Sequence, residues 1–485
     1  MRFGSVLFLL GRLLLAITAA LLVPAAVSLY HDGPDFRAFM ITAAIAGIAG
    51  VTLQRVFKPR GELQLGRREA FLLVAAAWGT ASLIGAVPWI LVKGPLFAVD
   101  AMFESTSGFT TTGASILTDI EAQPVGLLLW RSLTHWLGGM GIIVLGIAIL
   151  PKLAVGGMEL LGAEAPGPTT EKLTPRIAQT AKALWVIYAG FTLAEALILI
   201  GLGVEALDAV NHAMATMATG GFSTLNASIA GFDSFAVEMV VVFFMVLAGA
   251  NFALHFQWIR GRPGPLFNDS EFRFYVGMLS IAAVLLVGDL MLNQSDGLVD
   301  ALRYGVFQAT AIITTTGFAT ADFDAWPHFS RALLFILMFV GGCAGSTGGS
   351  VKVARLMIVL RKLVSDLKRI LRPHAVIPVR LGQRAIPEEI VTSVTTFFIL
   401  FLSLFALGGL ILSLLGYDMI TAFSAAAACL GNIGPGFNLV GPTKNFAFFG
   451  APAKLVLMAM MIIGRLELYT ILVMLFVRPR WRRRK

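Results

Sequence analysis

Four stretches rich in threonine and glycine interrupt an otherwise apolar sequence. They read STSGFTTTGAS at 105–115, MATGGFSTLN at 217–226, ITTTGFATAD at 313–322 and LGNIGPGFNL at 430–439. When the central glycines are aligned, the equivalent triplets are Thr111, Thr112 and Gly113; Thr219, Gly220 and Gly221; Thr315, Thr316 and Gly317; and Asn432, Ile433 and Gly434. The fourth triplet diverges most, but the shared register indicates four copies of one unit.

The chemistry of these triplets is that of a cation filter. Backbone carbonyls and threonine hydroxyls can replace the water around a monovalent cation. Glycine lets successive carbonyls point at one axis and lets strands approach without side chains between them. A single TTTG motif is more simply explained by packing between membrane helices, where small residues are common. Four copies in register instead predict that the triplets together bind a transported cation.

A short apolar segment precedes each triplet and must position it. The segments begin near Asp100, Asp208, Asp300 and Asp418, and we predict that each aspartate is the N-cap of a short helix whose negative C-terminal end faces the glycines. Because these helices are too short to cross a bilayer, they should dip in from outside and return as extended chain. Glu104, Arg303 and Gln308 lie on these helices, and we expect them to brace the filter.

The composition defines the setting of these loops. Of 485 residues, 57% are hydrophobic and 13% are charged, which is more apolar surface than one water-soluble core can bury. We predict an all-α polytopic membrane protein. Its ten apolar spans should cover residues 4–30, 38–53, 71–93, 125–150, 180–203, 235–259, 273–293, 331–360, 391–415 and 453–477.

The spans and loops divide the chain into units. Two N-terminal transmembrane helices occupy 1–60, and four pseudo-symmetric helix, pore-loop, helix repeats surround a central pore. The predicted repeats are 71–150, 180–259, 273–360 and 391–477, followed by a basic tail at 478–485. The third repeat contains GGCAGSTGGS at 341–350, a run that should unwind its second span near mid-membrane.

Basic residues predict the orientation in the membrane. An even number of spans puts both termini on one side. The basic clusters all fall on that side, which makes it cytoplasmic. They are Arg55, Lys58 and Arg60, the basic residues of 352–384 and the ending RPRWRRRK. Membrane orientation thus explains the net charge of +9, and no nucleic-acid partner is needed. We expect the first span to be a retained helix rather than a cleaved signal, because Arg12 interrupts it.

The other candidate polar residues show no spacing that is typical of a chemical site. Lys352 is not part of a phosphate-binding loop, since the required spacing is missing. His135, His212 and His255 show no metal-ligand or catalytic spacing. The two cysteines, Cys343 and Cys429, are expected to be small buried packing residues. These patterns speak against an unrelated class, a polytopic membrane enzyme.

The four loops, GGCAGSTGGSVKVAR at 341–355 and GRLELYTILVML at 464–475 together resemble the Trk/Ktr/HKT superfamily of potassium transporters. Within it, the chain is most similar to the membrane subunit of bacterial Trk systems. The resemblance implies K⁺ as the transported ion, a bacterial inner-membrane location, no bound organic cofactor and no enzyme activity. It also implies a homodimer with a cytoplasmic nucleotide-binding regulatory ring, the TrkA-type subunit.

The resemblance also implies a gate beneath the filter. Its residues are Gly345, Ser346, Thr347, Gly348 and Gly349, together with Arg465, which would project toward the pore and repel cations. The alternatives are a flexible packing kink for the loop and a buried salt bridge for Arg465, whose charge must avoid lipid in either case. A sodium-permeable relative is a further alternative. In this superfamily serine at the first filter glycine goes with sodium permeation, whereas all four positions here are glycine.

Overall fold

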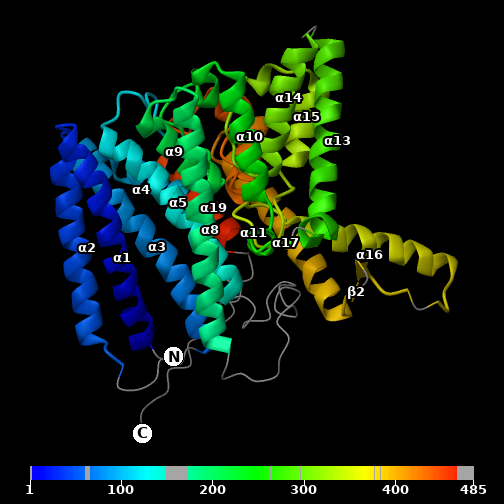
Figure 1. Ribbon diagram of the computed structural model, residues 1–485, viewed down its shortest axis with the longest axis horizontal. Helices are drawn as coiled ribbons and strands as arrows, with labels where there is room; N and C mark the ends of the chain where they lie inside the picture. Colours follow the sequence, from blue (N-terminus) through cyan, green and yellow to red (C-terminus); the bar gives the residue numbers. More distant parts are fainter. Residues whose placement is uncertain are drawn as a thin grey trace.

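The fold is a bundle of long helices around short ones (Figure 1). The computed structural model describes residues 3–59, 66–148, 173–262, 264–294, 297–375, 377–382 and 384–466. Among these residues, six helices are long and apolar enough to cross a membrane. They are α1 (Phe3–Tyr30), α2 (Phe36–Val56), α3 (Arg67–Lys93), α8 (Leu173–Gly201), α13 (Ser270–Asn293) and α17 (Glu388–Leu414).

The remaining elements follow a recurring order in which a long helix is followed by a short buried helix, a loop and a further helix. The short helices are α4 (Ala98–Phe109), α9 (Ala206–Met217), α14 (Leu298–Ile313) and α18 (Met419–Gly431). The helices after the loops are α5 (Val125–Ala148), α10 (Phe235–Gly249), α15 (His328–Leu337) and α19 (Ala451–Arg465). Single 3-10 turns are η1 (Pro95–Phe97), η3 (Ser228–Phe232), η4 (Phe323–Ala325) and η5 (Asn438–Val440).

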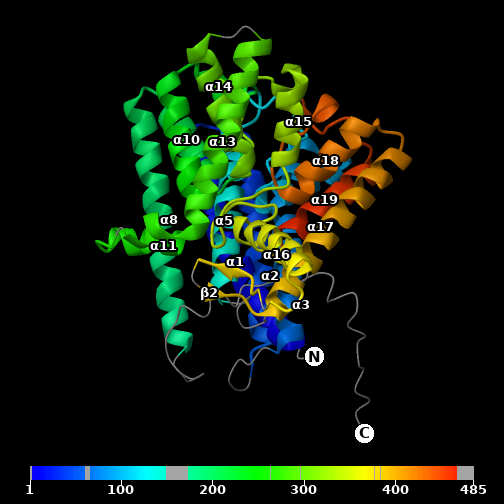
Figure 2. The ribbon, with the colours of Figure 1, turned by 90° about the vertical axis from the view of Figure 1, so that its right-hand side faces the viewer.

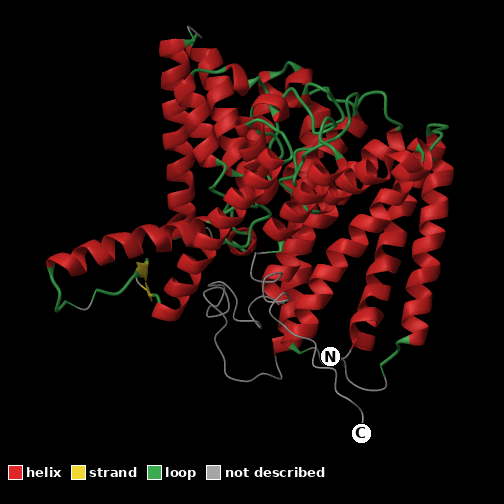
Figure 3. Cartoon of the chain, turned by 180° about the vertical axis from the view of Figure 1, so that it is seen from behind, coloured by secondary structure: helices red, strands yellow, loops and turns green. Residues whose placement is uncertain are grey.

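Three further helices and one strand pair lie outside this order. They are α11 (Phe252–Ile259), α12 (Gly264–Asn268), α16 (Val353–Leu371), β1 (Arg380–Leu381) and β2 (Arg384–Ala385). The strands pair antiparallel, with Arg380 opposite Ala385, and are the small yellow element beside the helices in Figure 3. The described part of the chain is therefore almost entirely helix and connecting loop.

The predicted span at 235–259 is divided between two helices. Helix α10 ends at Gly249 and α11 starts at Phe252, with a bend of 103° between them, so α11 projects sideways in Figure 2. Asn251 caps α11 by accepting a hydrogen bond from the Ala253 amide at 2.9 Å. The carbonyl of Gly249 accepts instead from the amide of Cys343 at 2.8 Å. A contact from a distant segment thus ends this helix.

The predicted interruption of 331–360 is confirmed, but the helix does not resume in line. Residues 338–352 contain no helix, and α16 then runs sideways, away from the bundle and across the direction of α13 (Figure 1). Residues 331–360 therefore do not form one continuous helix. Parts of other predictions lie outside the described residues: 149–150 of the first repeat, most of the connection 151–178, residues 467–477 of the last span and the tail 478–485.

Only one of the predicted aspartate caps is an N-cap. Asp418 precedes α18, and its carboxylate accepts a hydrogen bond from the Thr421 amide at 3.0 Å. Asp100, Asp208 and Asp300 instead lie inside the first turns of α4, α9 and α14, whose N-cap residues make no side-chain cap bond. An acidic residue in the first turn still interacts favourably with the helix dipole. The helices therefore start close to where the aspartates predict them.

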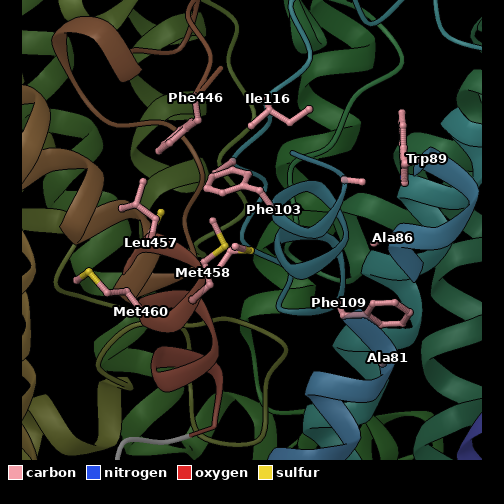
Figure 4. Packing of buried hydrophobic residues seen from close by; sticks show 14 of the residues in the cluster. Ala81, Ala86, Trp89, Phe103, Phe109, Ile116, Phe446, Leu457, Met458 and Met460 are labelled. Atoms are coloured by element: carbon pink, nitrogen blue, oxygen red, sulfur yellow. The ribbon is translucent and has the colours of Figure 1, made fainter. Parts of the chain in front are cut away.

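A hydrophobic cluster joins the two ends of the described chain. Phe103 of α4 lies against Phe446, with ring centroids 5.7 Å apart, and Leu457 and Met458 of α19 complete the contact (Figure 4). Trp89 of α3 and residues of α1 belong to the same cluster. Burial of such side chains contributes about 1.5–3 kcal/mol each in water-soluble proteins, and here it closes the arrangement of short helices into a ring.

Candidate ion-binding ring and the loop beneath it

The four loops have the same unusual backbone at the positions that the sequence aligns. Thr111, Thr219, Thr315 and Asn432 have φ values of 52°, 53°, 59° and 52°. Two residues later, Gly113, Gly221, Gly317 and Gly434 have φ values of 79°, 80°, 75° and 106°. The left-handed region is uncommon for threonine. Its recurrence shows that the chain turns out of each short helix in one common way.

The loops touch one another in a closed cycle. A Cβ atom added to any of the first three glycines would overlap a carbonyl oxygen of the next loop, and one added to Gly434 would lie 2.9 Å from such an oxygen. The pairs are Gly113 with Gly220, Gly221 with Thr316, Gly317 with Ile433, and Gly434 with Thr112. Each carbonyl belongs to the residue directly before the next central glycine. We call this arrangement the glycine ring.

A cavity of about 140 Å³ opens onto this ring. All four central glycines contribute to its wall, together with residues 114–115, 117–118 and 440–446. Ser115, Ser223 and Asn445 add polar groups to the wall. The cavity therefore lies directly beside the ring.

The side chains behind the ring differ from loop to loop. Thr112 pairs with Thr110, and Thr316 with Thr314, with their hydroxyl oxygens 2.8 Å apart in both pairs. In the second loop the ring of His135 fills the space of the missing side chain at Gly220 and stacks on Phe222 with centroids 4.0 Å apart. The hydroxyls of Thr112 and Thr316 are thus engaged with neighbouring side chains.

The fourth loop is tied to the first by its amide side chain. The Asn432 Nδ2 donates to the Thr112 hydroxyl at 2.9 Å and to the Met461 carbonyl at 3.0 Å. This divergent residue therefore closes the ring between the last and first loops.

A buried ion pair supports the first two loops. Arg131 Nε donates to Glu104 Oε1 at 2.8 Å, and both side chains are buried. The same guanidinium donates to the Ser223 carbonyl at 2.9 Å, while Glu104 accepts from the Ile116 amide at 3.0 Å. Glu104 thus braces the loop as expected. Arg131 was missed, although an arginine inside the apolar run LLLWRSL is itself a sign of a functional position.

The other two residues that were expected to brace the filter make different contacts. Arg303 makes two bonds to Glu238 of α10, of 2.7 and 2.8 Å, and a longer one of 3.4 Å to Asp233 in the connection before α10. Gln308 lies 3.5 Å from the hydroxyl of Thr320, just beyond the third glycine.

The predicted gating loop lies against the ring. The Gly349 amide donates to the Thr315 hydroxyl at 2.6 Å. The Thr347 hydroxyl donates to the carbonyls of Met217 and Ala248 at 3.1 and 3.2 Å. Residues 345–349 are therefore packed at the ends of α9 and α14, where these helices lead into the ring.

Arg465 reaches the same loop from the last helix. Its Nη1 donates to the Thr347 carbonyl at 2.7 Å and its Nη2 to the Gly138 carbonyl at 3.4 Å. The side chain is buried. The loop and Arg465, which are 118 residues apart in the sequence, are thus neighbours beside the ring.

The histidines and cysteines form no common centre. His212 binds the Ser223 hydroxyl at 2.9 Å, and His255 binds the Leu247 carbonyl at 2.9 Å. Cys343 and Cys429 are both buried free thiols, as predicted. Within the described ranges, no group of three His, Cys, Asp or Glu residues could hold a metal ion.

A bundle of apolar helices built around a ring of backbone carbonyls defines a membrane transport protein. The chain belongs to the TrkH family, described as cation transport protein, which matches residues 36–480. This is a family of potassium transporters and not of enzymes.

Relatives match over the whole length. The Trk system potassium uptake protein TrkH of Salmonella typhimurium is 40% identical, with 99% of this chain and 100% of the relative covered. The corresponding protein of Halomonas elongata is 39% identical, with both chains covered fully. The crystal structure of the potassium transporter TrkH from Vibrio parahaemolyticus superposes with a TM-score of 0.90 at 35% identity, covering 99% of this chain and 100% of that one.

Proposed function

We propose that this protein takes up K⁺ across the bacterial inner membrane through the glycine ring, which acts as a pseudo-fourfold selectivity filter. The observation that carries the proposal is the closed cycle of glycine-to-carbonyl contacts through all four loops. Four C-terminal helix ends, those of α4, α9, α14 and α18, meet at this ring. Their partial negative charges favour a cation, and the carbonyls replace its hydration shell.

The selected ion is K⁺ rather than Na⁺. The relatives are potassium uptake proteins by name, and all four central positions are glycine. The ligands are the carbonyls of the triplets at 111–113, 219–221, 315–317 and 432–434.

The chain crosses the membrane ten times, with both termini in the cytoplasm. Two helices within 1–60 precede four pore repeats at 71–150, 180–259, 273–360 and 391–477. In support, the end of α2 and the starts of α3, α8 and α17 lie at the same end of the bundle in Figure 1. The last turn of α2 carries Arg55, as expected for a cytoplasmic face.

Residues 345–349 and Arg465 form the gate. The loop contacts the ends of the short helices at the ring, and the guanidinium is held beside it. A charge that persists at any cellular pH raises the barrier to cations in a narrow path.

The working assembly is a homodimer bound to a cytoplasmic nucleotide-binding ring. The name Trk system among the relatives supports a regulatory partner. The basic surface that α16 provides suits the cytoplasmic side, where such a partner would bind.

Uptake of rubidium into liposomes containing the purified protein tests the function. Rubidium and potassium should enter much faster than sodium. Repeating the measurement with and without an imposed proton gradient distinguishes channel-like flux from coupled transport. Equal rates for potassium and sodium would contradict the filter and favour the sodium-permeable alternative.

A further inference from the structure

One carboxylate oxygen holds both ends of the loop beneath the ring. Glu271 is the second residue of α13. Its Oε1 accepts from the amide of Ala344, at the start of the loop, at 2.7 Å. The same oxygen accepts from the amide of Ala354, in the first turn of α16, at 3.0 Å. This side chain therefore bridges the two ends of a non-helical segment, next to the backbone bonds from Gly341 to Val351 and from Val353 to Gly342.

A buried ammonium holds the inside of the same segment. Lys352 Nζ donates to the carbonyl of Ser346 at 3.3 Å, to its hydroxyl at 3.2 Å and to the carbonyl of Gly348. The carboxylate thus binds amides and the ammonium binds carbonyls of one loop. Buried backbone groups outside regular structure need such partners, and bonds to charged groups are stronger than neutral ones.

Glu271 lies directly after the connection that precedes α13. Asp269 caps the helix by accepting from the Phe272 amide at 2.7 Å, and α12 directly precedes this cap. The segment also contacts the break between α10 and α11, where the backbone amide of Cys343 donates to the Gly249 carbonyl. A displacement of the 264–272 connection therefore moves the carboxylate relative to the two amides it binds.

We propose that Glu271 is the latch of the 345–349 gate, and that movement of the 264–272 connection opens the path by drawing its carboxylate away from the amides of Ala344 and Ala354. This inference rests on the proposed function of the loop as a gate. Without the carboxylate, two amide donors lose their acceptor, and the closed loop loses the stabilisation that they supplied. Glu271 is a positioning residue and does not contact the transported ion.

The native thiol of Cys343 reports on the latch. It lies directly before Ala344 and is 1% exposed, and in a Cys429→Ala background it is the sole thiol, since the chain has two cysteines. In proteoliposomes, Glu271→Ala should accelerate its modification by a water-soluble maleimide about tenfold or more, as expected for losing hydrogen bonds to a charged group. Rubidium flux should rise in parallel.

Two variants control this measurement. Glu389→Ala removes a carboxylate from the same position of another helix, the second residue of α17, where it is exposed, and should change neither rate. Glu271→Gln keeps an oxygen acceptor without the charge and should lie between the wild type and Glu271→Ala. Equal acceleration in both Glu271 variants would overturn the role of the two amide bonds.

The remaining outcomes separate the latch from the gate. Faster modification of Cys343 with unchanged rubidium flux would support the latch and overturn the gate. In a further outcome, Glu271→Ala shows the same rates of Cys343 modification and rubidium flux as Glu389→Ala, while deletion of 345–349 raises flux. That result would overturn the latch and leave the gate supported. Melting temperatures in detergent establish that each variant is folded.

Discussion

Arg465 donates a hydrogen bond of 2.7 Å to the carbonyl oxygen of Thr347. This bond joins the last described helix to the loop between α15 and α16. It places a permanent positive charge against a segment that itself touches the glycine ring through Thr315. The relationship gives the proposed gate two parts, a backbone obstruction and a fixed charge, which can be tested separately.

Removing the charge should speed cation passage. We expect Arg465→Ala to raise rubidium uptake per folded molecule about tenfold or more, a factor that requires a barrier lower by about 1.4 kcal/mol. Arg465→Lys should keep much of the barrier while losing the planar fork that binds the loop. Uptake is normalised to detergent-stable protein. A stable Ala variant without increased flux would show that the residue only ties the bundle together.

Shortening the loop should raise flux without changing selectivity. Deletion of residues 345–349 removes the obstruction but leaves the glycine ring, whose carbonyls lie in other segments. The ratio of potassium to sodium permeability should stay near that of the wild type while the rate rises. Loss of flux in a variant that is folded and inserted would speak against a gate.

Substitution in the ring should weaken selectivity. In Gly113→Ser or Gly317→Ser, the new Cβ would overlap the carbonyl of Gly220 or Ile433. We expect the potassium-to-sodium permeability ratio to fall about tenfold, or about 1.4 kcal/mol of lost discrimination. Gly416→Ser is the matched control, because this glycine has φ of 95° but no atom near its Cβ position. A ratio unchanged in both ring variants would refute the filter.

The buried pair of Arg131 and Glu104 should act as a unit. Arg131→Met leaves an unpaired buried carboxylate and should destabilise the protein by about 3–5 kcal/mol. Replacing both residues, as Arg131→Met with Glu104→Leu, should recover part of that loss, because no buried charge remains. Thermal unfolding in detergent measures both effects. Additive losses in the double variant would mean that the two side chains act independently.

The sequence by itself determined the class of protein, the long helices and the register of the loops. Hydropathy depends on composition over some twenty residues, so α1, α3 and α17 could be placed closely from sequence. The glycines of the four loops aligned correctly because a left-handed turn restricts the residue locally. The break at 341–350 was visible for a similar reason, since its glycines and hydroxyl residues disfavour a helix.

Only the tertiary structure decided which distant groups meet. The 103° bend after Gly249 was missed because Asn251 is the one polar residue in an apolar run there, and the carbonyl at the break is bound by the amide of the distant Cys343. Arg131 and Glu271 were missed as functional candidates because their partners lie 27 and 73 or more residues away. Local propensity acts through neighbouring residues, whereas these bonds form only when packing of the helices brings separate segments within about 3 Å.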